Sequence, residues 1–144
     1  MFAGTMMSGR DFLDTNVLLY ALNDSAPAKH RVAQALVARA IAGEFSISTQ
    51  VLGEFAAVTL SKFRDHLTPQ DVVALLDSLT PIPLVKLDAE MVRRAVEAHS
   101  AYGLHFYDGM IVAAAERAGA QKIWSEDLNA GQKYFGVAVA DPFQ

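Results

Sequence analysis

Short apolar segments alternate with longer helical segments along the chain, and this alternation constrains the fold more than any other feature. Apolar residues recur at helical spacing in the longer segments, and turn residues separate these from the short ones. Because parallel strands need crossover connections, which are usually helices, we predict an α/β sandwich around a mostly parallel sheet. The predicted strands are 11–14, 45–48, 84–87, 122–124 and 137–139, and the predicted helices include 28–42, 69–79, 88–103 and 107–118, with Thr49 capping another.

The length of 144 residues fits a single domain. We expect residues 1–10 to be a loose N-terminal leader and residues 11–144 to form that domain. Apolar residues make up 52% of the chain and charged residues 19%, a balance that excludes a disordered protein. There is no cysteine, no signal-peptide pattern and no apolar run of the roughly 18–20 residues that cross a bilayer. We therefore expect a cytoplasmic protein without disulfides and without a membrane partner.

The charge balance bears on nucleic-acid binding. Twelve Lys and Arg residues stand against sixteen Asp and Glu residues, which gives a formal net charge of −4. This balance argues against a protein that holds nucleic acid by phosphate neutralisation alone, but it is compatible with one that handles phosphates through metal ions. Neither GxGxxG nor GxxxxGK(S/T) occurs, so no glycine-rich phosphate loop is predicted.

Four acidic residues from distant parts of the sequence are predicted to meet at one edge of the sheet. Asp14 ends the first strand, and Glu54 lies in the helix that follows the second. Asp108 lies in the opening turn of an alanine-rich helix, and Asp127 follows the strand 122–124. Ligands of open parallel sheets bind at the carboxyl ends of the strands. Carboxylates without cysteine favour Mg²⁺ or Mn²⁺ over zinc, so a site for one of these ions is the hypothesis.

Each acid also has an ordinary structural role open to it. Asp14 can cap the helix that follows it, and Asp108 can interact with the dipole of its own helix. Glu54 can be solvated, and Asp127 can be a turn residue. Position alone therefore suggests a metal site without establishing one.

Each of these acids lies in a distinctive residue string. The strings are DTNVLLY at 14–20, EF at 54–55, YDGMIVAA at 107–114 and SEDLNAGQ at 125–132, and the chain closes with VAVADPF at 137–143. The first four strings resemble the motifs of the PIN-domain ribonucleases and occur in the family's order. The closing residues are similar to the final strand and tail of the VapC toxins within that family, so the resemblance covers roughly residues 11–143.

This resemblance implies a three-layer sandwich with a mostly parallel five-stranded sheet flanked by helices. It also implies that four carboxylates line one pocket, bind Mg²⁺ or Mn²⁺ and are catalytic. Carried onto this sequence, these are Asp14, Glu54, Asp108 and Asp127.

The resemblance assigns supporting roles to neighbouring residues. Ser125 would support the pocket by hydrogen bonding, and Asn16 would order the turn behind Asp14. Glu126, next to a motif acid, would either face solvent or stand beside the metal ligands. Gly109 replaces the alanine that is usual in the family, and we expect the missing methyl to loosen that turn.

The implied activity is that of a metal-dependent endoribonuclease that cleaves RNA with a metal-activated water. The VapC resemblance further implies a toxin that pairs with a small antitoxin protein and forms a homodimer. A housekeeping PIN nuclease in RNA processing and a catalytically silent PIN binding module are the alternatives. An aspartyl-phosphate phosphatase would need two Asp separated by one residue, whereas two residues separate Asp11 and Asp14.

Basic residues have lesser roles in this hypothesis. The chemistry needs no histidine base, so the four histidines are expected to be structural or solvated; His105, three residues before Asp108, is the one nearest a motif acid. Lys29, Lys62 and Arg64 are candidate contacts to an RNA backbone.

Overall fold

The computed structural model describes residues 9–144. The strands in this part of the chain are β1 (Asp11–Leu13), β2 (Phe45–Ser48), β3 (Leu84–Val85), β4 (Lys122–Trp124), β5 (Lys133–Tyr134) and β6 (Val137–Ala140). The helices are α2 (Thr15–Leu22), α3 (Pro27–Ile41), α4 (Thr49–Lys62), α5 (Pro69–Ser78), α6 (Ala89–Tyr102) and α7 (Phe106–Arg117). Most of the expected leader, residues 1–8, lies outside the described residues. Gly9 and Arg10, its last two members, are hydrogen-bonded to the carbonyls of Gly119 and Gly43, each at 2.8 Å.

The strands form one sheet in the order β3-β2-β1-β4-β6-β5. All neighbouring pairs are parallel except β5 with β6. The α/β sandwich with a mostly parallel sheet is confirmed, whereas the strand number of five is wrong because β5 adds a sixth. This strand has only two residues and reaches β6 through Phe135 and Gly136, both with positive φ (50° and 83°). Such a short hairpin has no alternating apolar pattern, and Phe-Gly is not one of the usual turn signals.

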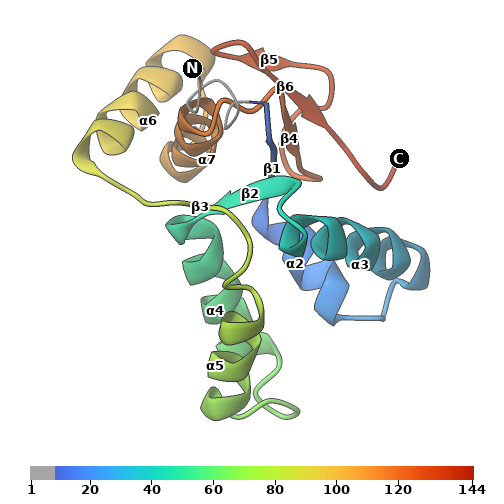
Figure 1. Cartoon of the computed structure of the whole chain (residues 1–144). Coiled ribbons are helices and arrows are strands. Elements are labelled where there is room, and N and C mark those ends of the chain that lie inside the picture. The colour runs from blue at the N-terminus through green and yellow to red at the C-terminus, as the bar shows by residue number, and fades with distance from the viewer. Residues whose placement is uncertain (1–8) are drawn as a thin grey trace.

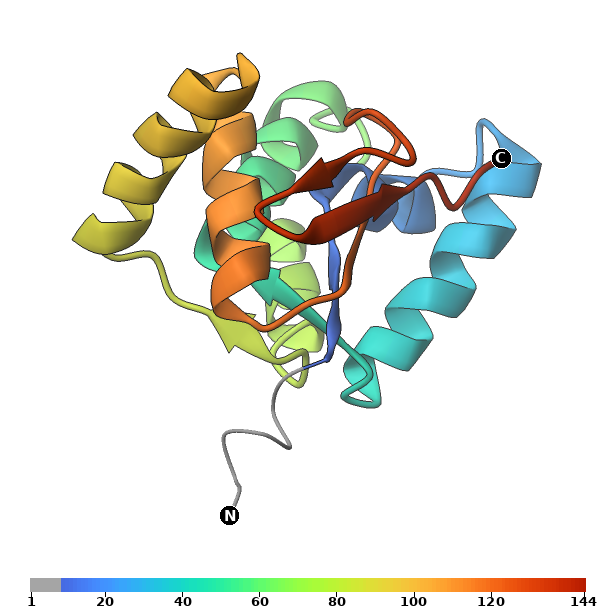
Figure 2. The same ribbon diagram turned by 90° about the horizontal axis from the view of Figure 1, so that it is seen from above.

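Helices cover both faces of the sheet (Figure 1). α6 and α7 lie on one side and α2 and α3 on the other, and the view from above shows the sheet between them (Figure 2). The α4–α5 pair extends from the end of the sheet at which β1 and β2 finish (Figure 1). No helix in the described part of the chain is both long and apolar enough to cross a membrane.

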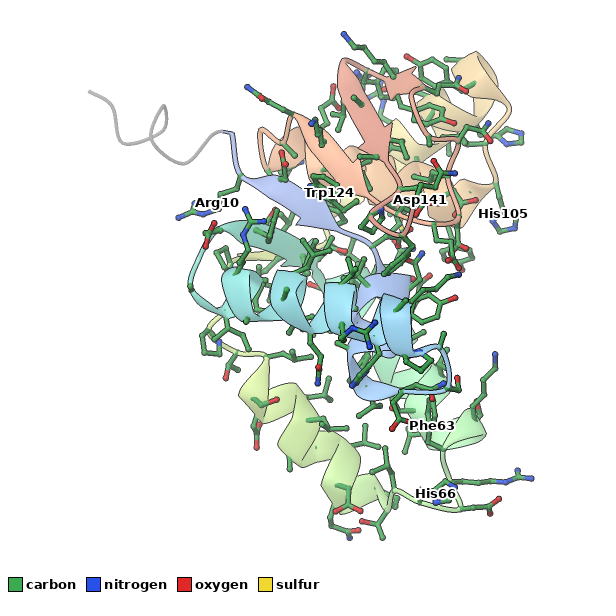
Figure 3. The ribbon with its side chains drawn as sticks, turned by 90° about the vertical axis from the view of Figure 1, so that its right-hand side faces the viewer. Arg10, Phe63, His66, His105, Trp124 and Asp141 are labelled. Carbon is green, nitrogen blue, oxygen red and sulfur yellow. The ribbon has the colours of Figure 1, made fainter. Side chains whose placement is uncertain are left out.

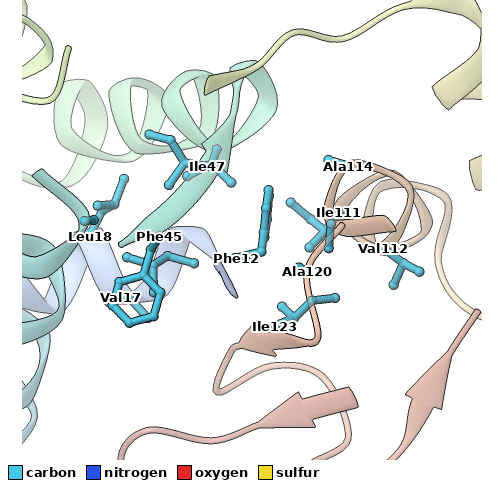
Figure 4. Packing of buried hydrophobic residues seen from close by; sticks show 14 of the residues in the cluster. Phe12, Val17, Leu18, Phe45, Ile47, Ile111, Val112, Ala114, Ala120 and Ile123 are labelled. Carbon is cyan, nitrogen blue, oxygen red and sulfur yellow. The ribbon is translucent and has the colours of Figure 1, made fainter. Parts of the chain in front are cut away.

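The core lies on both faces of the central strands, as expected for a parallel sheet covered by helices. Phe12 in β1 and Ile123 in β4 are fully buried, and Ile47 in β2 is 1% exposed. Ile111 and Val112 of α7 pack against this group from one side (Figure 4). Burial of these side chains fixes the strands that carry the acidic residues.

Side-chain caps set where the helices begin. The Ser48 hydroxyl accepts a hydrogen bond from the backbone N–H of Val51 at 3.3 Å and so caps α4, one residue earlier than the predicted Thr49. Asp14 caps α2 in the same way, with its carboxylate on the N–H of Thr15 at 2.8 Å. Because both caps directly follow a strand, the first turns of α2 and α4 start at the carboxyl edge of the sheet.

Candidate metal centre

Asp14 is the most buried acid of the group, with 6% of its surface exposed. Its Oδ1 accepts the N–H of Thr15 at 2.8 Å, and its Oδ2 accepts the Ser125 hydroxyl at 2.8 Å. Burial raises the pKa of this carboxyl to about 6, and the nearby carboxylates of Asp127 and Glu54 add to the rise, against the lowering effect of the two hydrogen bonds. Because burial and nearby negative charges disfavour the ionised form of Asp14, a cation bound beside it would stabilise that form.

Glu54 reaches the same region from the second turn of α4. Its Oε1 accepts the hydroxyl of Thr15 at 2.6 Å, and its Oε2 accepts the Gln50 amide at 3.1 Å. Thr15 is the residue next to Asp14, so one hydrogen bond links the first and second motifs. Glu54 is thus held against the start of α2 instead of pointing freely into solvent.

Asp108 and Asp127 complete the group from α7 and from the segment after β4. The pKa of Asp108 is raised chiefly by burial, and the carboxylates of Asp127 and Glu54 contribute, whereas His105 lowers it. Asp127 is exposed, and its Oδ2 accepts the side-chain amide of Asn16 at 3.0 Å. The charges of Asp127 and Glu54 thus lie close enough to both Asp14 and Asp108 to raise the pKa of each of these two carboxyls.

The acids do not form a closed ligand cage. Among residues 9–144, no three Asp, Glu or His side chains converge into a ready set of metal ligands. Mg²⁺ usually keeps several waters and binds through one or two carboxylates together with substrate phosphates, so an open group of this kind fits Mg²⁺ better than a dedicated cage would. The all-oxygen donor set fits Mn²⁺ equally well.

Gln50 supplies a further sign of a polar site. Its Nε2 donates to Glu54 and to the carbonyl of Tyr107, at 3.1 and 3.0 Å. Its Oε1 is buried and finds no hydrogen-bond partner within residues 9–144. A buried acceptor without a partner costs free energy unless a ligand or water satisfies it.

Glu126, in the segment after β4, is held by residues of α2 and α3. The hydroxyl of Tyr20 in α2 donates to Glu126 at 2.8 Å, and Lys29 in α3 forms an ion pair with the same carboxylate. These contacts, Lys29 foremost, lower the pKa of Glu126. Its backbone N–H donates to Asn16 at 3.4 Å. The Glu126 carboxylate therefore engages α2 and α3 and not the other acids.

The supporting residues lie where the motifs suggest. The Ser125 hydroxyl donates to Asp14 and accepts the N–H of Asp127 at 3.1 Å, so it connects the first and fourth motifs. The side chain of Asn16 donates to the Asp127 carboxylate and accepts the backbone N–H of Glu126, so it contacts two residues of the fourth motif. The sequence did not indicate Thr15, Gln50 or Tyr20, although Gln50 is four residues before Glu54 on the same helix face and could have been found from that spacing.

Gly109 has a different role from the expected one. A Cβ at this position would lie 2.7 Å from the carbonyl oxygen of Ala95, which is too close. The glycine therefore allows α7 to pack tightly on the backbone of α6, and the prediction that it loosens its turn is wrong.

Two other charged regions are separate from this group. A cavity of about 460 Å³ beside α6 and α7 contains none of the four acids, and its Arg94 pairs with Glu97 and Glu116 at 3.0 and 2.8 Å. Asp11 accepts the indole N–H of Trp124 at 3.0 Å and the backbone N–H of Lys122. Asp11 thus ties β1 to β4 and is not a second member of a phosphatase motif.

Comparison with known structures finds proteins of similar fold. A toxin–antitoxin complex from Klebsiella pneumoniae is 19% identical, with a TM-score of 0.66 over 92% of this chain and 97% of that one. VapC20 of Mycobacterium tuberculosis, described as a toxin that cleaves the sarcin–ricin loop, is 20% identical, with a TM-score of 0.63 over 81% and 89%. VapBC2 of Rickettsia felis bound to promoter DNA is 17% identical, with a TM-score of 0.61 over 90% and 96%. At these identities the likeness concerns the fold.

Sequence comparison identifies the family directly. No curated protein matches this sequence. The PIN domain family, in contrast, matches residues 12–135, a range that includes all four acids and every strand of the sheet except β6 and the first residue of β1. The chain therefore belongs to the PIN domain family.

Proposed function

We propose that this protein is a metal-dependent endoribonuclease and acts as the toxin of a toxin–antitoxin pair. The observation that carries the proposal is the buried Asp14 carboxylate, coupled to Glu54 and Asp127 at the carboxyl edge of a PIN sheet. Support comes from structural neighbours that are toxins or toxin complexes, one of them described as cutting an RNA loop.

The proposed metal ligands are drawn from the four acids, and the ion is Mg²⁺ or Mn²⁺. When bound, such an ion supplies an activated water and neutralises charge that develops on the attacked phosphate. Asp14 would anchor the ion, because its position is fixed by Thr15 and Ser125. Asp108 and Asp127 are less constrained and would adjust to the ion and to the substrate phosphate.

The alternatives differ in what they require of the acids. A catalytically silent PIN binding module would not need the four motif acids, all of which this chain has. A housekeeping PIN nuclease would use the same acids but would act without an antitoxin. Measurement of RNA cleavage distinguishes the proposed ribonuclease from the silent binding module. Co-expression with an antitoxin distinguishes the proposed toxin from a housekeeping nuclease.

Cleavage of a panel of structured RNAs with Mg²⁺ or Mn²⁺ tests the enzymatic part. Asp14→Asn should abolish cleavage while the variant stays folded in a thermal melt, because the amide fills the same space. Asp24→Asn is the matched control, since Asp24 is an exposed acid beyond the end of α2. Full activity in Asp14→Asn, or wild-type cleavage in excess EDTA, would refute a metal-dependent nuclease.

Expression in cells tests the toxin and its partners. We expect growth arrest that is relieved by co-expression of a small antitoxin encoded by the neighbouring gene, with a complex that co-purifies. We also expect a homodimer, measurable by light scattering at two protein concentrations, and action on RNA in the cytoplasm. Growth arrest that the neighbouring gene does not relieve would contradict a cognate antitoxin and favour the housekeeping nuclease.

A further inference from the structure

An aromatic and histidine-lined cavity lies at the start of α7, outside the four acids. It measures about 320 Å³ and is formed by Val96 and His99 of α6 together with His105 and Phe106. The ring of Tyr107 lies beside it, with its centroid 5.1 Å from that of Phe106 and 6.0 Å from that of His105. Two consecutive rings, His105 and Phe106, therefore line the opening, and a third, Tyr107, lies next to them.

Hydrogen bonds hold the backbone of this segment and the α6 wall, whereas the rings of His105 and Tyr107 are exposed. His99 shares a hydrogen bond with the carbonyl of Leu104 through Nδ1 at 2.6 Å, which fixes the wall of the cavity on α6. His105 caps α7 by accepting the N–H of Tyr107. Tyr107 nevertheless has 54% of its surface exposed, and Figure 3 shows His105 projecting from the edge of the fold. A contiguous group of rings such as His105, Phe106 and Tyr107, unlike a single exposed apolar residue, marks a candidate binding surface.

The cavity is connected to the candidate metal centre through two short links. Asp108 directly follows Tyr107 in the first turn of α7. The carbonyl of Tyr107 accepts the Gln50 amide, and the same amide binds Glu54. A nucleic-acid strand whose phosphate lies at the acids would therefore place a neighbouring base beside these rings.

We propose that His105, Phe106 and Tyr107 form a stacking site for an unpaired nucleobase of the RNA substrate, next to the scissile phosphate. Unpaired RNA bases stack on the faces of Phe, Tyr and His, and such stacking tolerates different bases. The net charge of −4 leaves little general attraction for an RNA backbone, so a stacked base would add to the affinity that a metal-held phosphate supplies. This inference rests on the proposed ribonuclease function and adds where the enzyme holds its substrate.

The test measures binding of a single-stranded RNA octanucleotide that carries 2-aminopurine, in EDTA so that no cleavage occurs. Tyr107→Leu removes the exposed ring, and His105→Asn removes the imidazole while keeping an acceptor for the helix cap. Each should weaken RNA binding about five-fold or more, the scale of losing one base–aromatic stack, and should abolish the fluorescence change that stacking causes. Tyr107→Phe keeps the ring and should restore the affinity that Tyr107→Leu loses.

Phe63→Leu is the matched control, because it removes a half-buried ring at the end of α4, far from His105 (Figure 3). Cleavage kinetics provide a second readout, in which Tyr107→Leu raises KM more than it lowers kcat.

Three other outcomes would overturn the stacking site. RNA affinity that is unchanged in Tyr107→Leu and His105→Asn, in a protein that still cleaves RNA, refutes the stacking site alone. A wild-type protein that neither binds nor cleaves RNA refutes the proposed function as well. Loss of affinity for the antitoxin with RNA affinity retained would make this surface a protein-docking face instead.

Discussion

Lys29 in α3 and Glu126 after β4 form an ion pair that ties the fourth motif to the helices on one face of the sheet. The amino group of Lys29 also lies 5.0 Å from the centre of the Tyr20 ring, and Tyr20 packs edge-on against Phe143 at 4.9 Å. Glu126 thereby holds the backbone that carries Asp127, although its own carboxylate points to other partners. The contacts of Glu126 therefore indicate that it positions the segment of Asp127.

Reversing this ion pair tests that role. Lys29→Glu should lower cleavage several-fold, because it repels Glu126 and disturbs the segment of Asp127. The double variant Lys29→Glu with Glu126→Lys should recover part of the loss. Unfolding free energy should change by about 1 kcal/mol or less, since both side chains are partly exposed.

Lys86→Glu, an exposed lysine beyond β3, controls for the change in net charge. If Lys29 instead contacts the RNA backbone, as its sequence position also allows, the double variant will be as impaired as Lys29→Glu. That result would contradict the positioning role.

Glu54 and Glu126 offer a direct comparison of two glutamates in motifs. Glu54→Gln should lower cleavage at least roughly ten-fold, equivalent to about 1.4 kcal/mol of transition-state stabilisation, because Glu54 belongs to the coupled group of acids. Glu126→Gln should cost several-fold or less, since the amide oxygen still accepts from Tyr20. Single-turnover cleavage at saturating Mg²⁺ measures both. If Glu126→Gln is inactive and Glu54→Gln is active, the assignment of Glu54 as the acid of the second motif is wrong.

Gly109 and Gly53 should respond in opposite ways to alanine. Gly109→Ala places a methyl 2.7 Å from the Ala95 carbonyl, so we expect α6 and α7 to separate at a cost of about 1–3 kcal/mol. Gly53→Ala meets no atom within 4 Å on an exposed face of α4 and should stabilise the protein by up to about 1 kcal/mol. Urea unfolding of the two variants checks this pair. Equal effects would contradict a close approach of α7 to α6.

The parts of the fold that could be predicted are those with a local signal. Proline and capping residues placed the start of α5 at Thr68, where the predicted opening forms a reciprocal cap with Asp71 at 2.8 and 3.1 Å. Buried apolar runs placed β1, β2 and β4. The strand β5 had no such signal, because its two residues depend on pairing with β6 and not on their own propensity.

The sequence predicted which residues belong to the candidate site but not which side chains they contact. Motif order selected the four acids as candidate ligands, and the fourth motif predicted that Ser125 supports the pocket by hydrogen bonding, as its bond to Asp14 does. The partners of Glu54 and Glu126 could not be predicted in this way. Thr15, Tyr20 and Lys29 reach these carboxylates across 39 to 106 residues of sequence, which only the packing of the helices brings together.

The raised pKa of Asp14 predicts that, at neutral pH and without metal, the Asp14→Asn variant has a higher free energy of unfolding than the wild type. The folded-state pKa is about 6 and the ordinary value is 3.8, so the folded protein retains this proton over that range. Below about pH 4 the carboxyl is neutral in the folded and in the unfolded state, so its burial does not lower the free energy of unfolding through charge. As pH rises from about 4 to 6 the unfolded chain releases this proton and the folded protein does not, so the free energy of unfolding falls. Above about pH 6 the folded carboxyl ionises as well, and the loss levels off at a value on the order of 3 kcal/mol.

Asp14→Asn removes this loss, so in EDTA at pH 7.5 the variant should be more stable than the wild type to urea. The difference should shrink toward zero near pH 4, and Mg²⁺ at pH 7.5 should stabilise the wild type but not the variant. Asp24→Asn, at an exposed position, should show no such pH dependence. A stability difference that is constant between pH 4.5 and 7.5, or a variant less stable than the wild type at pH 7.5, would mean that burial does not hold Asp14 ready for a cation.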